Sequence, residues 1–217
     1  MRMQLILLMA FTVVGCSENT PEFSPIEYRS IKDVKGVITI TLSDTKNSYA
    51  AKVGSENVEQ FKRVGGPAYP LAVKENKTKK PLLKGSSEAR LVRPYAIGPD
   101  GKFLASGIAW VGMDPETATN ILGILEYPGG AVRAEYKAPE MYVIESIAWA
   151  PNSEMIAVLT RRSTIGKFPG DILASVAGHP VSYLTFALEI IKLDGSKVMS
   201  LNLGSNFQSG FGFVSWN

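Results

Sequence analysis

YAIGPDGKFLASGIAW, residues 95–110, and SIAWAPNSEMIAVLTRR, residues 146–162, are two versions of one pattern. Each contains a short apolar strand, a polar turn that begins with proline, and a second strand of almost continuous apolar residues. In the first version Pro99 presets the backbone of the turn, the Asp100 side chain bonds back to the main chain, and Gly101 takes the left-handed position. Asn-Ser replaces Asp-Gly in the second version. The pattern predicts two similar antiparallel hairpins.

A further hairpin is predicted after each of these stretches. Residues 121–137 contain two strand patterns around Pro-Gly-Gly, and residues 184–204 contain two around Asp-Gly-Ser. The segment FGFVSWN at residues 211–217 aligns with SIAWAPN and places Trp216 where Trp149 stands one repeat earlier. Two hairpins in series form a four-stranded antiparallel sheet, and such sheets recurring at intervals of about 50 residues are typical of propeller blades.

These units resemble the TolB-type propeller repeat, whose consensus runs apolar-x-W-S-P-D-G-K-x-I-A-F. The match is good over residues 95–110 and 146–160 and looser over residues 184–217, and Gly98 replaces the Trp-Ser pair in the first copy. The expected fold class is therefore all-β, with antiparallel four-stranded blade-like repeats in a β-propeller or partial propeller. Residues 95–217 would supply two blades and a last strand. The alternative is two unrelated hairpins in another all-β fold.

Residues 31–94 are expected to be a β-rich N-terminal part with candidate diverged blades. Residues 37–42 alternate as in a strand, residues 43–47 form a turn, and a strand follows at residues 49–53. Residues 55–64 are expected to form a short helix that ends at Gly-Gly-Pro. Because propellers need about four or more blades to close, either this part supplies them or the chain is the front of a longer protein. A final strand that pairs with the N-terminal sheet would hide an exposed edge.

The start of the chain predicts an export signal. A single cation, Arg2, precedes an apolar run at residues 5–14 that is short for a membrane span. VVGC at Val13-Val14-Gly15-Cys16 closes this run with the only cysteine of the chain. It resembles the lipobox of bacterial lipoproteins, in which the signal is removed before the cysteine and the thiol is acylated. The alternative is a first core strand with a buried cysteine.

The lipoprotein resemblance implies a signal peptide at residues 1–15, a lipid such as palmitate on Cys16, and a flexible tether over residues 16–30. The protein would then lie in the cell envelope, bound to a membrane through its lipid anchor. In that family an Asp directly after the cysteine retains the protein at the inner membrane. Ser17 stands there, which favours the periplasmic face of the outer membrane if the organism has one.

Charge argues against a nucleic-acid partner. The formal net charge is +3 for 217 residues, which is too small an excess to create a strong general field for phosphate backbones. A lysine-rich segment, KENKTKKPLLK at residues 74–84, is expected to be a solvated loop, because neither an aromatic residue nor an arginine accompanies it. Contact of this segment with anionic headgroups is the alternative.

Candidate catalytic chemistry is sparse. His179 is the only histidine and lies in a long loop at residues 163–182. Ser175 or Ser182 with Asp171 would complete a triad, but the chain has no G-x-S-x-G motif. No metal-ligand spacing and no glycine-rich phosphate motif is present either. We therefore expect no enzyme activity, no catalytic residues, no cofactor and no metal.

Two long loops are the candidate recognition elements, at residues 111–120 and 163–182. The second is the candidate partner-binding loop, and its residues of interest are Phe168, Ile172, Leu173 and His179. Exposed apolar residues in a long loop indicate a contact with a partner. The alternative is that they fold back over a sheet edge.

These observations predict a membrane-anchored extracytoplasmic lipoprotein that acts as a binding or scaffolding module for an envelope protein or glycan. A second hypothesis is a truncated N-terminal propeller part of a larger envelope protein, such as a prolyl-oligopeptidase-like hydrolase. A degenerate gene product without function is a third.

Overall fold

The computed structural model describes residues 20–27, 34–54, 57–66, 89–110, 119–166, 176, 181–208 and 210–217. Its strands are β1 Glu22–Phe23, β2 Val37–Ser43, β3 Ser48–Gly54, β4 Val58–Gly65, β5 Ala89–Ile97, β6 Phe103–Trp110, β7 Ile121–Glu126, β8 Val132–Lys137, β9 Val143–Trp149, β10 Met155–Ile165, β11 Ser182–Lys192, β12 Lys197–Gln208 and β13 Gly212–Trp216. Within the described ranges, no helix has the length and apolar character needed to cross a membrane.

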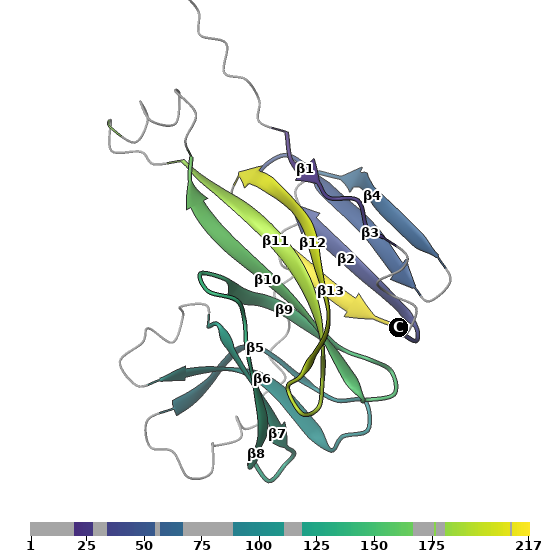
Figure 1. The fold of residues 1–217 in the computed structure, drawn as a ribbon, viewed down its shortest axis with the longest axis vertical. Helices are drawn as coiled ribbons and strands as arrows, with labels where there is room; N and C mark the ends of the chain where they lie inside the picture. The colour runs from purple at the N-terminus through teal and green to yellow at the C-terminus, as the bar shows by residue number, and fades with distance from the viewer. Residues whose placement is uncertain are drawn as a thin grey trace, which may run out of the picture.

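The strands form three antiparallel sheets (Figure 1). The first sheet has the order β13-β2-β3-β4, the second β5-β6-β7-β8, and the third β1-β12-β11-β10-β9. The prediction of an all-β fold with four-stranded antiparallel repeats is therefore confirmed, because the second sheet and β9 to β12 of the third are each two hairpins in series. A closed propeller is not identified among the described strands.

The proline turns form as the sequence predicts. Gly101 has a φ of +70°, and the Asp100 carboxylate accepts a hydrogen bond from the Lys102 N–H at 3.0 Å. In the second copy Ser153 occupies the left-handed position with a φ of 60°. Residue 153 thus adopts the conformation that glycine provides in the first copy, at a modest cost for a residue with a side chain.

Hydrogen bonds between sheets align the strands. The Asp100 N–H donates to Ser153 Oγ at 3.0 Å, and Trp149 Nε1 donates to the Ala96 carbonyl at 2.9 Å. The turns after β5 and β9 therefore lie together. β13 lies beside β9, where the Val214 N–H donates to Ser146 Oγ at 3.3 Å, so the first sheet is aligned with the third as well.

This alignment gives the molecule two distinct ends. Because successive strands are antiparallel, consecutive connections alternate between them. We call the end that carries the tight turns after β5, β7, β9 and β11 the turn end. The opposite end, at which β4, β6, β10 and β12 finish, is the loop end. The long connections at residues 67–88, 111–118 and 167–180 all begin at the loop end.

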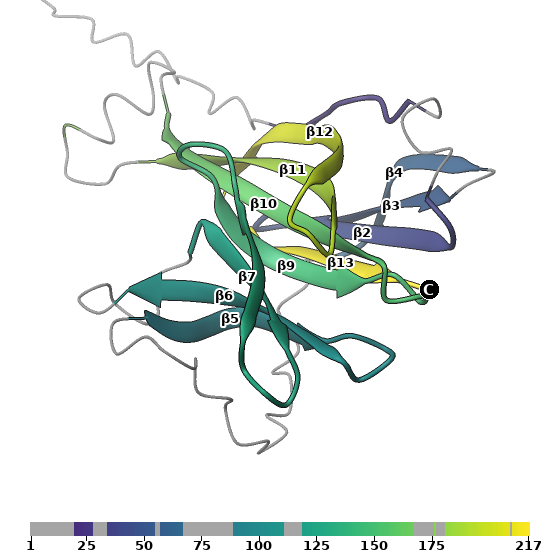
Figure 2. The ribbon, with the colours of Figure 1, turned by 60° about the horizontal axis from the view of Figure 1, so that its bottom comes forward.

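The core lies on both faces of the third sheet (Figure 2). Ala157 and Leu159 of β10 belong to the cluster shared with the first sheet. Ile156 and Val158, which alternate with them, belong to the cluster shared with the second sheet. This confirms the prediction that the apolar run at residues 155–159 is covered on both faces. Each aliphatic side chain buried in this way stabilises the fold by about 1.5–3 kcal/mol.

β13 pairs with β2, so a C-terminal strand lies in the same sheet as the N-terminal strands. The register runs from Gly212 opposite Leu42 to Trp216 opposite Ile38. The main chains of Val37 and Asn217 continue the ladder with two hydrogen bonds, at 2.7 and 3.0 Å. The predicted alternative in which a final strand covers the N-terminal sheet is thus confirmed, and residues 34–66 supply three strands of one sheet.

The helix predicted over residues 55–64 is wrong, because this segment contains β4. The Gly-Gly-Pro stop after Val64 favoured a short helix. Instead Val58 pairs with Val53 of β3, and Phe61 packs against the core. Pairing with β3 and burial of Phe61 outweigh the weak local preference. As an edge strand, β4 carries the charged residues that discourage further pairing.

The folded domain begins earlier than residue 31. β1 pairs with β12, and Ile26 is only 4% exposed. The Phe23 ring stacks on Phe61 at 4.7 Å, and both main-chain groups of Ile26 bond to the Gln60 amide at 2.9 Å. The part of the predicted tether from residue 22 to 26 is therefore docked on the domain.

Substitutions at two glycines test the contact between the second and third sheets. Gly101 and Gly195 both have positive φ, at 70° and 80°. A Cβ at Gly101 would meet nothing within 4 Å, whereas a Cβ at Gly195 would lie 2.5 Å from the Glu135 carbonyl oxygen of β8. Gly101→Ala should lower the free energy of unfolding by about 1 kcal/mol through strain alone. Gly195→Ala should cost about 1–3 kcal/mol more. Equal costs in urea denaturation would contradict the packing.

Candidate functional site

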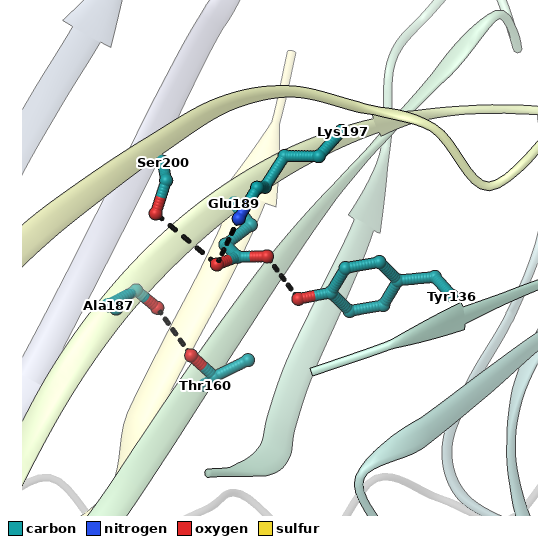
Figure 3. A network of polar contacts seen from close by, with 6 residues as sticks. All are labelled: Tyr136, Thr160, Ala187, Glu189, Lys197 and Ser200. Carbon is teal, nitrogen blue, oxygen red and sulfur yellow. Dashed lines mark hydrogen bonds and ion pairs between the residues drawn. The ribbon is translucent and has the colours of Figure 1, made fainter. Parts of the chain in front are cut away.

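The most deeply buried carboxylate of the described residues is Glu189, in the middle of β11. It is 1% exposed and lies between apolar residues in the sequence LEII. Figure 3 shows that Tyr136 approaches it from β8 of the second sheet, while Lys197 and Ser200 approach from β12. We call these four residues the Glu189 cluster.

Three donors satisfy the Glu189 carboxylate. The Tyr136 hydroxyl donates to Oε2. Ser200 Oγ donates to Oε1 at 3.2 Å, and Lys197 Nζ lies 3.5 Å from the same oxygen. A buried charge costs several kcal/mol unless it is paired and hydrogen-bonded, so the fold depends on these donors to accommodate the carboxylate.

Burial raises the pKa of the Tyr136 hydroxyl far above its usual value. Loss of solvation is the largest cause, followed by the hydrogen bond to Glu189 and the repulsion between that carboxylate and a phenolate. Tyr136 therefore stays protonated at neutral pH and acts as a hydrogen-bond donor.

The chemistry of the Glu189 cluster is structural. Both carboxylate oxygens accept hydrogen bonds inside the fold, and the Tyr136 proton is donated to Oε2, so we assign the cluster no acid–base step. Among the residues described, no group of three or more His, Cys, Asp or Glu side chains could hold a metal ion. The cluster connects the second sheet to the third.

A second polar group lies toward the loop end of β10. Arg161 Nε is 2.5 Å from Glu145 Oε2. The guanidinium of Arg162 lies over the Tyr142 ring, 5.4 Å from its centroid. The Arg162 Nε atom is buried and has no hydrogen-bond partner among the described residues. Such an atom can donate to a carboxylate or phosphate oxygen together with a neighbouring guanidinium nitrogen.

The predicted site residues lie mostly outside the part of the chain that the structure describes. These residues are Cys16, Phe168, Asp171, Ile172, Leu173, Ser175 and His179. Ser182 is described and begins β11 as an exposed residue opposite Ile165. The lipid attachment site and the candidate partner-binding loop therefore stay predictions.

The hairpin aspartates have the turn role that the sequence predicts. Asp194 Oδ1 accepts hydrogen bonds from Ser196 Oγ at 2.5 Å and from the Ser196 N–H at 2.9 Å. These two bonds hold the pKa of the Asp194 carboxyl below its ordinary value. Asp44 caps the turn after β2 in the same way, by accepting from the Asn47 N–H at 2.6 Å.

Glu189 was not singled out from the sequence, although a signal was present. The strand YLTFALEIIK carries one acidic residue among side chains that fill a core. Acidic residues are seldom fully buried without a partner. A lone carboxylate in such a strand thus indicates a buried polar contact, but its partner Tyr136, on another sheet, cannot be read from the sequence.

The chain matches no family model, and no curated protein matches its sequence. A proposal for its function therefore depends on its own residues and their geometry.

Replacing Tyr136 with Phe tests the Glu189 cluster. The variant leaves a buried carboxylate with one donor fewer, so the free energy of unfolding should fall by about 1.5–3 kcal/mol at pH 7. Tyr95→Phe, at a position that is 44% exposed, should change it by less than about 0.5 kcal/mol.

The stability difference between wild type and Tyr136→Phe is also expected to depend on pH. The pKa of Tyr136 is raised above the ordinary value of 10.0, so its contribution is fully present below pH 10 and is lost as the pH rises above it. The difference between wild type and Tyr136→Phe should therefore shrink from pH 7 to pH 11 in urea denaturation. An unchanged difference would count against the buried hydrogen bond.

Proposed function

We propose that this chain is a lipid-anchored protein of the bacterial cell envelope whose all-β domain is a binding or scaffolding module for an envelope protein or glycan. In this proposal its three sheets are blades of a small or partial propeller. Cys16 carries the lipid, and the loop end carries the recognition elements. No step of catalysis is assigned to it.

The observation that supports a binding module is the difference between the two ends of the sheets. The turn end has the tight turns after β5, β7, β9 and β11. The loop end has the tight turn after β2, but the connections at residues 67–88, 111–118 and 167–180 all leave from it as well. Binding residues are concentrated on loops that a rigid scaffold positions. The third sheet, buried on both faces, is such a scaffold.

Described residues at the loop end are suited to contact a partner. Ile165, the last residue of β10, is 63% exposed. Arg162, three residues earlier in β10, lies over the Tyr142 ring, and its buried Nε has no hydrogen-bond partner among the described residues. Arginine and aromatic residues are enriched at protein interfaces.

The lipid anchor is tested by Cys16→Ser. The wild-type protein should stay in the membrane fraction after a carbonate wash, because two or more acyl chains bind a bilayer stably. The variant, which lacks the thiol, should be released into the soluble fraction. Immunoblots of both fractions measure this, and a variant that stays with the membrane would refute the anchor.

The recognition role is tested by shortening the connection between β10 and β11. The Gly166 N–H donates to the Val181 carbonyl at 2.7 Å, so a short Gly-Ser-Gly linker can replace residues 167–180 without moving either strand. In cells, chemical crosslinking of the wild type should give products with envelope components that the shortened protein lacks. Val198→Asn, at the turn end, is the matched control and should keep them. Identical products from all three proteins would rule out this role.

A further inference from the structure

The N-terminal segment docks on the domain in a defined direction. β12 runs toward the loop end, and β1 pairs with it in the antiparallel direction, with Glu22 opposite Ser205 and Phe23 opposite Gly204. β1 therefore runs away from the loop end, and the residues that precede Glu22 enter from the loop-end side. In Figure 1, β1 lies beside the end of β12.

Specific side-chain and backbone contacts hold this segment on the domain. Phe23 is packed against Tyr49, Phe61 and Phe207, with ring centroids 4.8, 4.7 and 5.5 Å away. Gly204 has a φ of +152°, and a Cβ there would overlap the Glu22 carbonyl oxygen. β12 thus makes room for β1 at the point where the two strands pair.

Only six peptide steps separate Cys16 from Glu22. A fully extended chain spans at most about 3.3–3.6 Å per residue, so the lipid is attached within about 20 Å of β1. A tether of this length does not allow the domain to turn over while β1 stays docked.

The most exposed apolar side chains lie at the same end. The large apolar residues with the highest exposure in the described chain are Val64 at 61%, Ile165 at 63%, Met141 at 69% and Val176 at 83%. All four lie at the loop end, at the end of β4 or β10 or in the connections after β8 and β10. Those at the turn end, Val37, Tyr95, Ile97, Val132 and Val198, are 41 to 44% exposed, and Phe211, between β12 and β13 at the loop end, is 42% exposed.

From these observations we infer that the loop end of the domain rests on the bilayer surface and that Met141, Ile165 and Val64 contact its headgroup region. The inference depends on the proposed lipid at Cys16. Burying apolar area in the interfacial layer adds to the binding free energy of the acyl chains. Partners of the loop end are then met at the membrane surface, which favours an envelope protein over a wall glycan.

The test measures which end is near lipid. The full acylated protein is reconstituted into phosphatidylethanolamine and phosphatidylglycerol vesicles that contain a lipid with a nitroxide on its headgroup. Because acylation occupies the Cys16 thiol, a second cysteine can be labelled with a fluorophore at Met141 or Ile165, or at the matched turn-end positions Tyr95 or Val198. Labels at 141 and 165 should be quenched severalfold more than labels at 95 and 198. Equal quenching, absent quenching or stronger quenching at the turn end would overturn the inference.

Two controls separate the possible failures. Mass spectrometry of the N-terminal peptide from the same sample reports acylation. An unacylated Cys16 would overturn the proposed function together with the inference, whereas an acylated protein without preferential loop-end quenching would overturn the inference alone. Gly204→Ala should displace β1 and reduce the quenching difference while acylation stays complete. A quenching difference that persists in this variant would show that β1 does not set the orientation.

Discussion

The pairing of β13 with β2 is the constraint on which the rest of the structure depends. It joins residues 212–216 to residues 38–42, so it closes a loop of nearly the whole chain, and the entropic cost of that closure must be repaid by the contacts it allows. Two of these are the burial of Trp216 against the core and its Nε1 hydrogen bond to the Lys35 carbonyl at 2.8 Å. Without β13 the β2 edge would be open, and the first sheet would lose the strand that lies against β9 of the third. The third sheet would then expose one of its two apolar faces.

The other face of the third sheet is held differently. Trp149 and the paired proline turns join the second sheet to the third at one end. The Glu189 cluster joins β8, the edge strand of the second sheet, to β11, the central strand of the third. The first connection is read from a local sequence pattern. The second consists of a buried carboxylate whose donors come from two sheets. Burying the carboxylate costs desolvation energy, but all of its donors are satisfied in only one relative position of the strands.

The sequence was informative wherever structure is decided locally. Pro99, Asp100 and Gly101 define their turn by their own backbone preferences, and the continuous apolar run at residues 155–159 can be stable only when covered on both faces. Prediction failed where a distant partner decides. Residues 58–65 pair with β3, which lies outside the local pattern that predicted a helix. Ile26 lies in a segment that resembles a tether, but the Gln60 amide binds it to the domain. Glu189 has no visible partner along the chain. The candidate site residues at Cys16 and in the loop around His179 lie outside the described residues, so their roles stay predictions.

This architecture supports the proposed function, because a three-sheet body with its long connections at one end can present loops to a partner. The most direct test of the account is hydrogen exchange of the individual backbone amides in β2, β13 and β10. If the β13–β2 pairing closes the fold, the amides of Thr41 and Phe213, which face each other across this ladder, should exchange only through global unfolding, with the same opening free energy as those of Val158 and Leu159. Exchange of the β13 amides through a much easier local opening, while β10 keeps its full protection, would contradict it.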